Sequence, residues 1–145
     1  MFQHLLIATD GSDLATKAVQ HGLALAKVLN AKTTAITVTE PWSSVVAGEM
    51  ALAFPPDEYD KSVTANALKI LAQVEKFAEL AGVPCDTMHV KDQFPAEGIV
   101  ETANGRGCDL IVMASHGRRG LKRLLLGSQA QKVVTHGMIP VLIYR

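Results

Sequence analysis

Short runs of consecutive apolar residues recur along the chain and predict the strands of a buried sheet. The clearest runs cover residues 5–8, 110–114 and 141–144. Continuous runs of this length suit strands that are covered on both faces, as in a parallel sheet. Two patchier segments, residues 33–39 and 84–90, are predicted as further strands, and the proline that opens the second fits only at a strand start.

Between these runs, apolar residues recur at helical spacing. Residues 14–29 carry such a period, and residues 68–81 carry a second one that ends before Gly82. Shorter helices are predicted over residues 96–102 and 128–136. The alternation of strands and helices predicts an α/β protein, a single doubly wound domain over residues 1–145 with a five-stranded parallel sheet.

The predicted topology gives an expected place for a ligand. Right-handed crossovers put the loops that follow each strand on one edge of the sheet. Ligands in such sheets bind at that edge, near the point where the strand order reverses. The least regular stretch, residues 41–60, holds three of the six prolines and the one tryptophan. Because it is long for a connection, it is expected to act as a lid or contact segment.

Composition narrows the classes of function. The chain is 48% apolar, and Lys+Arg and Asp+Glu both number 14. Such a chain can bury a core, and its neutrality gives no reason to expect nucleic acid or a membrane as partner. The first apolar run stops at Asp10, and no stretch approaches the roughly 20 apolar residues of a membrane helix. With two cysteines, Cys85 and Cys108, the expected compartment is the cytoplasm.

The strongest candidate for chemistry starts where the predicted fourth strand ends, at Met113 and Ala114. A loop with Gly117 follows, and Gly127 and Ser128 then open a helix, whose free N–H groups and dipole suit a phosphate. The glycines would let the backbone approach an anion. The loop carries no acidic residue and four basic ones, which are Arg118, Arg119, Lys122 and Arg123. An ordinary solvated loop with a helix cap is the alternative, but the succession of features favours anion binding.

Two side chains near these glycines have open roles. Asp10 follows the first strand and could accept ribose hydroxyls or hold a divalent cation. By itself the segment around Asp10 is explained more simply by a turn with a capped helix. His116 could contact phosphate or ribose, or only shape its loop. The motifs GxxxxGK[ST], GxSxG and HExxH are absent. The sequence also shows no strong pair of nucleophile and base, so fast catalysis is not predicted.

At these residues the chain resembles the universal stress protein family over essentially its whole length. Residues 8–12, Ala-Thr-Asp-Gly-Ser, match the family's opening. The pattern G-x2-G-x9-G-[ST] of its nucleotide-binding branch is met by Gly117, Gly127 and Ser128, with Ala114 in place of the first glycine. The nine-residue interval makes the match specific. The resemblance implies a Rossmann-like sheet in the order 3-2-1-4-5.

The resemblance also implies a ligand, ATP or AMP, which Mg²⁺ could accompany. Val38 is expected to meet the adenine through its backbone, and Asp10 to face the ribose or the metal. The methyl group of Ala114 is expected to crowd the sugar or the phosphates. The full set of expected nucleotide-binding residues is Ala8, Thr9, Asp10, Val38, Met113, Ala114, His116, Gly117, Arg118, Gly127, Ser128, Gln129 and Ala130.

Three hypotheses for the function follow. The first is a regulatory stress-response module, a homodimer joined through the last strand, whose nucleotide state alters dimer contacts or binding to a still unidentified protein. The second is a slow Mg²⁺-dependent ATPase or phosphotransferase that uses Asp10. The third is an interaction protein that has lost nucleotide binding because of Ala114.

Overall fold

The computed structural model describes residues 1–117 and 126–145 of the chain. The four basic residues of the glycine loop, Arg118, Arg119, Lys122 and Arg123, lie outside this part. The elements in chain order are β1 (His4–Ala8), α1 (Asp13–Leu29), β2 (Lys32–Val38), α2 (Trp42–Val45), α3 (Met50–Ala53), α4 (Pro56–Ala81), β3 (Cys85–Val90), α5 (Pro95–Gly105), β4 (Leu110–Ala114), α6 (Ser128–His136) and β5 (Val141–Tyr144).

The strands form one parallel sheet in the order β3-β2-β1-β4-β5, which confirms the predicted fold and strand order. Leu5 of β1 pairs with Thr33 of β2 on one side and with Leu110 of β4 on the other. Thr33 in turn pairs with Cys85 of β3. The strand order therefore reverses at β1, and the carboxyl ends of β2, β1 and β4 lie next to one another.

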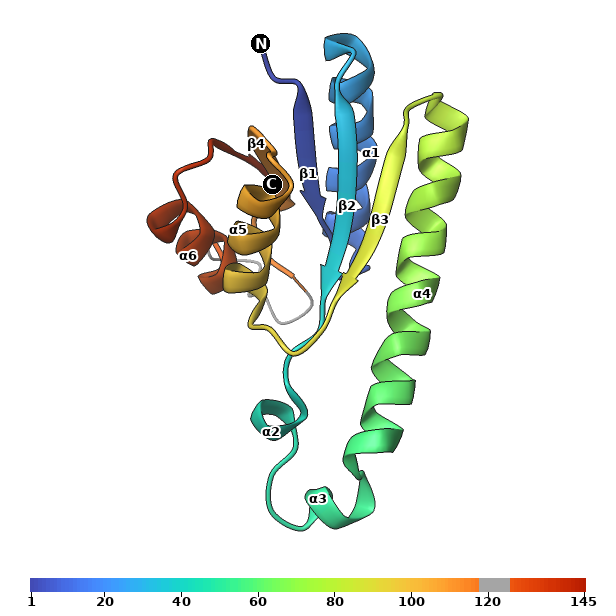
Figure 1. Cartoon of the computed structure of the whole chain (residues 1–145), viewed down its shortest axis with the longest axis vertical. Helices are drawn as coiled ribbons and strands as arrows, with labels where there is room; N and C mark the ends of the chain where they lie inside the picture. Colours follow the sequence, from blue (N-terminus) through green and yellow to red (C-terminus); the bar gives the residue numbers. More distant parts are fainter. Residues whose placement is uncertain (118–125) are drawn as a thin grey trace.

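Helices cover both faces of the sheet (Figure 1). Leu5 and Ile7 pack into a core with residues of α1 and α4, whereas Leu6 and Ala8 pack into a core with residues of α5 and α6. Successive β1 residues thus point to opposite faces, and both faces are buried. This double burial is the physical reason that residues 5–8 of β1 and every residue of β4 are apolar.

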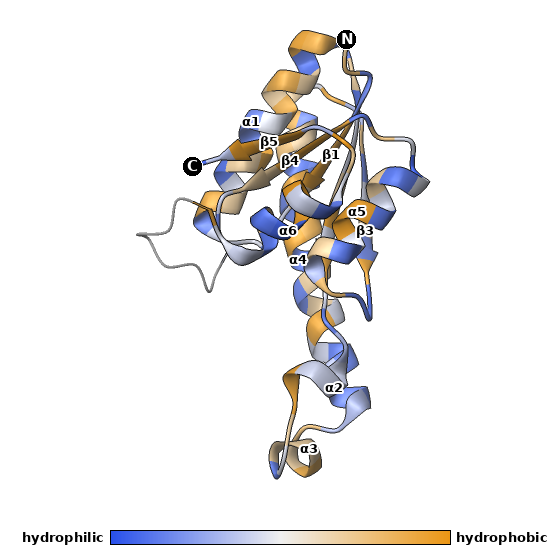
Figure 2. Ribbon diagram, turned by 90° about the vertical axis from the view of Figure 1, so that its left-hand side faces the viewer, coloured by the Kyte–Doolittle hydropathy of each residue, from blue (hydrophilic) through white to orange (hydrophobic). Residues whose placement is uncertain are grey.

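Residues 41–60 are more regular than the sequence predicted. Two four-residue helices, α2 and α3, lie here, and α4 already begins at Pro56, inside the predicted irregular stretch. A proline at the first helical position is favourable, because the missing N–H has no partner there. The first half of α4 extends beyond the sheet and carries α2 and α3 at its tip (Figures 1 and 2), so it shows no long buried stripe. We call residues 41–60 the arm.

The arm is joined to the sheet by its own buried contacts. The indole N–H of Trp42 donates a hydrogen bond of 2.8 Å to the carbonyl of Phe54. Phe54 packs edge-on against the ring of Tyr59, with 5.9 Å between ring centroids. Tyr59 is buried, and its hydroxyl donates a hydrogen bond of 2.7 Å to the carbonyl of Glu40, just beyond β2. Among the described residues, no helix has the length and apolarity needed to cross a membrane.

Candidate functional site

A cavity of about 530 Å³ opens at the carboxyl edge of the sheet, where the strand order reverses. This volume falls within the range of about 300–1,000 Å³ that is typical of small-molecule sites. Every predicted site residue except Arg118, which lies outside the described residues, lines it: Ala8, Thr9, Asp10, Val38, Met113, Ala114, His116, Gly117, Gly127, Ser128, Gln129 and Ala130. The structure thus brings the predicted residues together, and their contact with a nucleotide stays a prediction.

Six further residues that the sequence did not single out also line the cavity. They are Ala15, Ile36, Glu40, Pro95, Ile99 and Ser115. Ile36 and Glu40 could have been found from the sequence, because they flank Val38 at two-residue spacing and so share its face of the strand. Pro95 and Ile99 belong to the start of α5, and their presence at the cavity depends on how that helix crosses the sheet.

Gly127 joins the two ends of the glycine loop. Its N–H donates a hydrogen bond of 2.6 Å to the carbonyl of Ser115. A Cβ added at Gly127 would lie 2.7 Å from that carbonyl oxygen and 3.2 Å from the Cα of His116. The space beside Gly127 is thus filled by the chain itself, whereas we expected it to serve the approach of an anion. Gly127 has φ −69°, so the requirement for glycine here is steric rather than conformational.

Asp10 is held in a turn, as the simpler interpretation predicted, and it also lines the cavity, so its contact with a ribose or a metal ion stays a prediction. Its Oδ1 accepts a hydrogen bond of 2.9 Å from the Ser12 N–H. The Ser12 hydroxyl caps α1 by accepting from the Ala15 N–H at 3.3 Å. Gly117 approaches from β4, and a Cβ there would collide with Oδ2 of Asp10. The two sequence motifs, more than 100 positions apart, therefore meet at one point.

The starts of α5 and α6 lie side by side at the cavity. Oε1 of Gln129, in the first turn of α6, accepts a hydrogen bond of 3.1 Å from the Ala96 N–H in the first turn of α5. Gly127 is the N-cap of α6 and Ser128 is its first residue, so Ser128 is not the cap, and among the described residues no side-chain hydrogen bond caps this helix. The N–H groups of the first α6 turn therefore lack a capping side chain, and a helix start of this kind can bind an anion.

The methyl group of Ala114 packs on the opposite side of β4 from Met113. It belongs to a small cluster with Ala15 and Ala18 of α1. Met113 instead packs with the core that contains residues of α5 and α6. Ala114 and Ala15 also line the larger cavity, so the expectation that this methyl group crowds the sugar or the phosphates stays a prediction, while the packing against α1 favours the opposite outcome.

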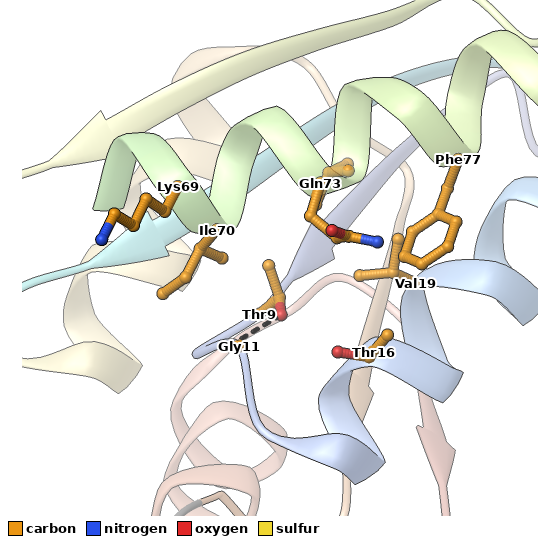
Figure 3. Close-up of a pocket in the computed structure, with 9 residues that line it drawn as sticks. Thr9, Gly11, Thr16, Val19, Lys69, Ile70, Gln73 and Phe77 are labelled. Atoms are coloured by element: carbon orange, nitrogen blue, oxygen red, sulfur yellow. Dashed lines mark hydrogen bonds between the residues drawn. The ribbon is translucent and has the colours of Figure 1, made fainter. Parts of the chain in front are cut away.

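A smaller cavity of about 170 Å³ lies on the other face of the sheet, between α1 and α4 (Figure 3). Thr9 and Gly11 line it, and the Thr9 hydroxyl accepts a hydrogen bond of 3.1 Å from the Gly11 N–H. Ile70 of α4 faces this turn from across the cavity, and Phe77 lies beside Val19 of α1 (Figure 3). Thr9 lines both cavities, and Asp10 lines the larger one. The turn after β1 therefore forms a wall that both cavities share.

Cysteine and histidine side chains are held by packing and local hydrogen bonds. Burial, with a smaller contribution from Asp109, raises the pKa of the Cys108 thiol to about 11. Burial also raises the pKa of Cys85 and lowers that of His89, whose ring nitrogen lies 2.9 Å from the Thr39 hydroxyl. In the part of the chain that the structure describes, no three His, Cys, Asp or Glu side chains form a group that could hold a metal ion.

These features define a doubly wound α/β protein with a ligand-sized cavity at its topological switch point. The chain belongs to the universal stress protein family, whose family model matches residues 1–145. Universal stress protein MJ0531 of Methanocaldococcus jannaschii is 36% identical over 148 residues, which cover 100% of this chain and 83% of that protein.

Two solved structures have the same fold. The structure of hypothetical protein MJ0577, also from Methanocaldococcus jannaschii, superposes with a TM-score of 0.84 at 27% identity, covering 99% of this chain and 96% of that one. The crystal structure of a universal stress protein in complex with cAMP superposes with a TM-score of 0.70 at 25% identity, covering 99% and 97%.

Proposed function

We propose that this universal stress protein binds an adenine nucleotide, ATP or AMP, in the larger cavity and acts as a stress-response module. The observation that carries the proposal is the order of chemical groups along the sheet edge. Apolar Ile36 and Val38 lie on β2, the Asp10 carboxylate follows β1, and the uncapped start of α6 lies beyond β4. This order matches the order of base, ribose and phosphate in a nucleotide. The apolar residues of β2 suit the base, Asp10 suits the ribose hydroxyls, and the start of α6 suits the phosphate anion.

The comparisons support the ligand class. One structural relative at 25% identity was solved in complex with cAMP, which shares the adenine, ribose and phosphate of AMP. In the proposed complex, Val38 contacts the adenine, Asp10 the ribose, and residues from Gly127 to Ala130 the phosphates. Within the described residues the carboxylates that line the cavity are Asp10 and Glu40. A Mg²⁺ ion at Asp10 would therefore take further oxygen ligands from the phosphates and from water, as is usual for this ion.

The proposed module works as a homodimer in the cytoplasm, with nucleotide state altering contacts to the second copy or to a partner protein. β5 pairs with β4 alone in the described chain, so its outer edge is open. Leu142 on this strand is 38% exposed. An apolar edge strand favours pairing with another strand, and a second copy of the same edge satisfies this symmetrically.

The experiment is to identify and follow the nucleotide on the purified protein. The bound fraction is released and identified by mass spectrometry, and ATP and AMP are titrated by calorimetry with and without Mg²⁺. Retained and unchanged ATP or AMP supports the binding module. Steady production of ADP or AMP from ATP favours the slow ATPase, and transfer of the phosphoryl group to another acceptor favours the phosphotransferase. Absence of retention and of binding heat favours an interaction protein without nucleotide.

A further inference from the structure

Glu40 lies at the end of the cavity where the proposed function puts the base. Ile36, Val38 and Glu40 follow one another at two-residue spacing and all three line the cavity. The intervening residues Thr37 and Thr39 do not line the cavity, and the Thr39 hydroxyl contacts the His89 ring. The alternation of an extended chain therefore continues one step beyond β2 and puts the Glu40 side chain on the cavity face.

The backbone around Glu40 is fixed from several sides. The Thr39 N–H donates to the Val90 carbonyl at 2.9 Å, which extends the β2–β3 pairing by one residue. The Thr39 carbonyl accepts from the Gln93 N–H at 3.4 Å. The carbonyl of Glu40 itself accepts from the hydroxyl of buried Tyr59 at 2.7 Å. A side chain on an anchored backbone loses less entropy on binding than one on a loose loop, which suits a recognition role.

We propose that Glu40 selects purine nucleotides that carry an amino group at position 6 of the base over those that carry an oxo group. The inference rests on the proposed function, because it requires the base to lie at the β2 end. An ionised carboxylate is purely an acceptor of hydrogen bonds. It can accept a charge-assisted bond from a 6-amino group, whereas a 6-oxo group would bring a second acceptor against it. Two acceptors that face each other without a shared hydrogen disfavour the 6-oxo ligand relative to the 6-amino ligand.

The test compares AMP, which has an amino group at position 6, with IMP, which has an oxo group there and a hydrogen on the neighbouring N1, by calorimetric titration. For the unmodified protein we expect AMP to bind about tenfold more tightly than IMP or better, the scale of one charge-assisted hydrogen bond. For Glu40→Gln we expect the ratio to fall to within roughly threefold, because an amide can turn to donate or to accept. Glu49→Gln is the matched control, since Glu49 is exposed on the arm and does not line the cavity. It should keep the original ratio.

The outcomes separate this inference from the proposed function. If the unmodified protein binds neither nucleotide, the proposed function fails and the inference fails with it. If AMP and IMP bind equally well, or if Glu40→Gln keeps the preference for AMP, the inference alone is overturned. The ratio of AMP to IMP affinity in the unmodified protein tests the inference without any variant. Circular dichroism of Glu40→Gln and of a second variant, Glu40→Ala, checks that both variants keep the fold.

Discussion

Gly117 lies directly against the carboxylate of Asp10, so the ends of β4 and β1 meet inside the larger cavity. A methyl group at position 117 would have to displace Oδ2 of Asp10, whose other oxygen is held by the Ser12 N–H. We expect Gly117→Ala to weaken AMP binding about tenfold or more while changing the melting temperature little, because the end of a side chain yields more easily than backbone. Calorimetry and thermal denaturation measure the two effects.

A double-variant cycle identifies the cause of that loss. In an Asp10→Ala background the carboxylate is gone, and adding Gly117→Ala should then cost almost no further affinity. Equal losses in both backgrounds would show that Gly117 acts on the ligand directly and not through Asp10.

The glycine at 127 should be required for stability as well as for binding. A Cβ here meets the carbonyl of Ser115 and the backbone of His116, so the ends of the glycine loop must separate. We expect Gly127→Ala to lower the free energy of unfolding by about 1–3 kcal/mol, as overpacking does elsewhere, and to abolish AMP binding. Gly105→Ala is the control, because a Cβ at the end of α5 meets no atom within 4 Å. An unaltered unfolding curve for Gly127→Ala would contradict the described loop contact.

Replacing Ala114 by the glycine of the family pattern should not improve binding. Its methyl group packs on Ala15 and Ala18 of α1, away from Met113. We expect Ala114→Gly to lower the free energy of unfolding by about 1–2 kcal/mol, through a lost buried methyl group and added chain entropy. The affinities for ATP and AMP should change less than threefold. A clear gain in ATP affinity would support the expectation of crowding instead.

Asp109 gives the stability a defined pH dependence. Its carboxylate accepts hydrogen bonds from the N–H groups of Gln3 and His4, at 2.9–3.1 Å. Partial burial raises the pKa of Asp109, but the N–H groups of His4, Gln3 and Asp109 itself lower it more, so this pKa lies below its ordinary value of 3.8. A group with a lowered folded pKa stabilises the fold above the ordinary pKa, and this contribution is lost as the pH falls through the folded value.

We therefore expect Asp109→Ala to lower the free energy of unfolding by about 1 kcal/mol at pH 7, the scale of the lost hydrogen bonds. The gap to the unmodified protein should narrow as the pH falls below 3.8. Urea denaturation at pH 7, 5 and 3 gives the three differences. A gap of constant size across this series would mean that the carboxylate charge does not contribute.

A charge on the outer strand should dissociate the proposed dimer. Val141 and Ile143 pack against the core on the α6 side, so changing them would test the fold, whereas Leu142 is 38% exposed. We expect Leu142→Lys to yield folded monomers by size-exclusion chromatography with light scattering. Leu80→Lys, at an equally apolar but 86% exposed position on α4, should remain dimeric. If Leu142→Lys remains dimeric, the interface lies elsewhere.

The sheet was predictable because its physical cause is local. A strand buried on both faces is mostly apolar, which the sequence shows directly, and β4, α6 and β5 have the predicted bounds. The helices of the arm could not be predicted in this way, because a helix of four residues completes barely one turn and cannot show a repeating apolar pattern. The first half of α4 has Tyr59 and little else buried, so no apolar stripe marks its start at Pro56.

The predicted site residues came together because a parallel sheet puts strand ends on one edge. What could not be predicted is which atoms fill the space beside each glycine. Gly127 meets its own loop, Gly117 meets Asp10, and Ala114 meets α1, and each contact depends on the angle at which a loop leaves its strand. Glu40 follows the predicted strand by one residue, and its place at the cavity could have been predicted because an extended chain puts it on the same face as Val38.

The strand register keeps the two thiols of the chain far apart. Cys85 pairs with Thr33, Thr33 with Leu5, and Leu5 with Leu110, so three strand spacings of about 4.8 Å, or roughly 14 Å, separate Cys85 from Leu110. Cys108 precedes Leu110 by two residues, and a disulfide needs Cα atoms within about 7 Å. The folded chain therefore cannot form an intramolecular disulfide between Cys85 and Cys108. A disulfide that forms on the native protein joins two copies, and it forms slowly, because burial disfavours both thiolates.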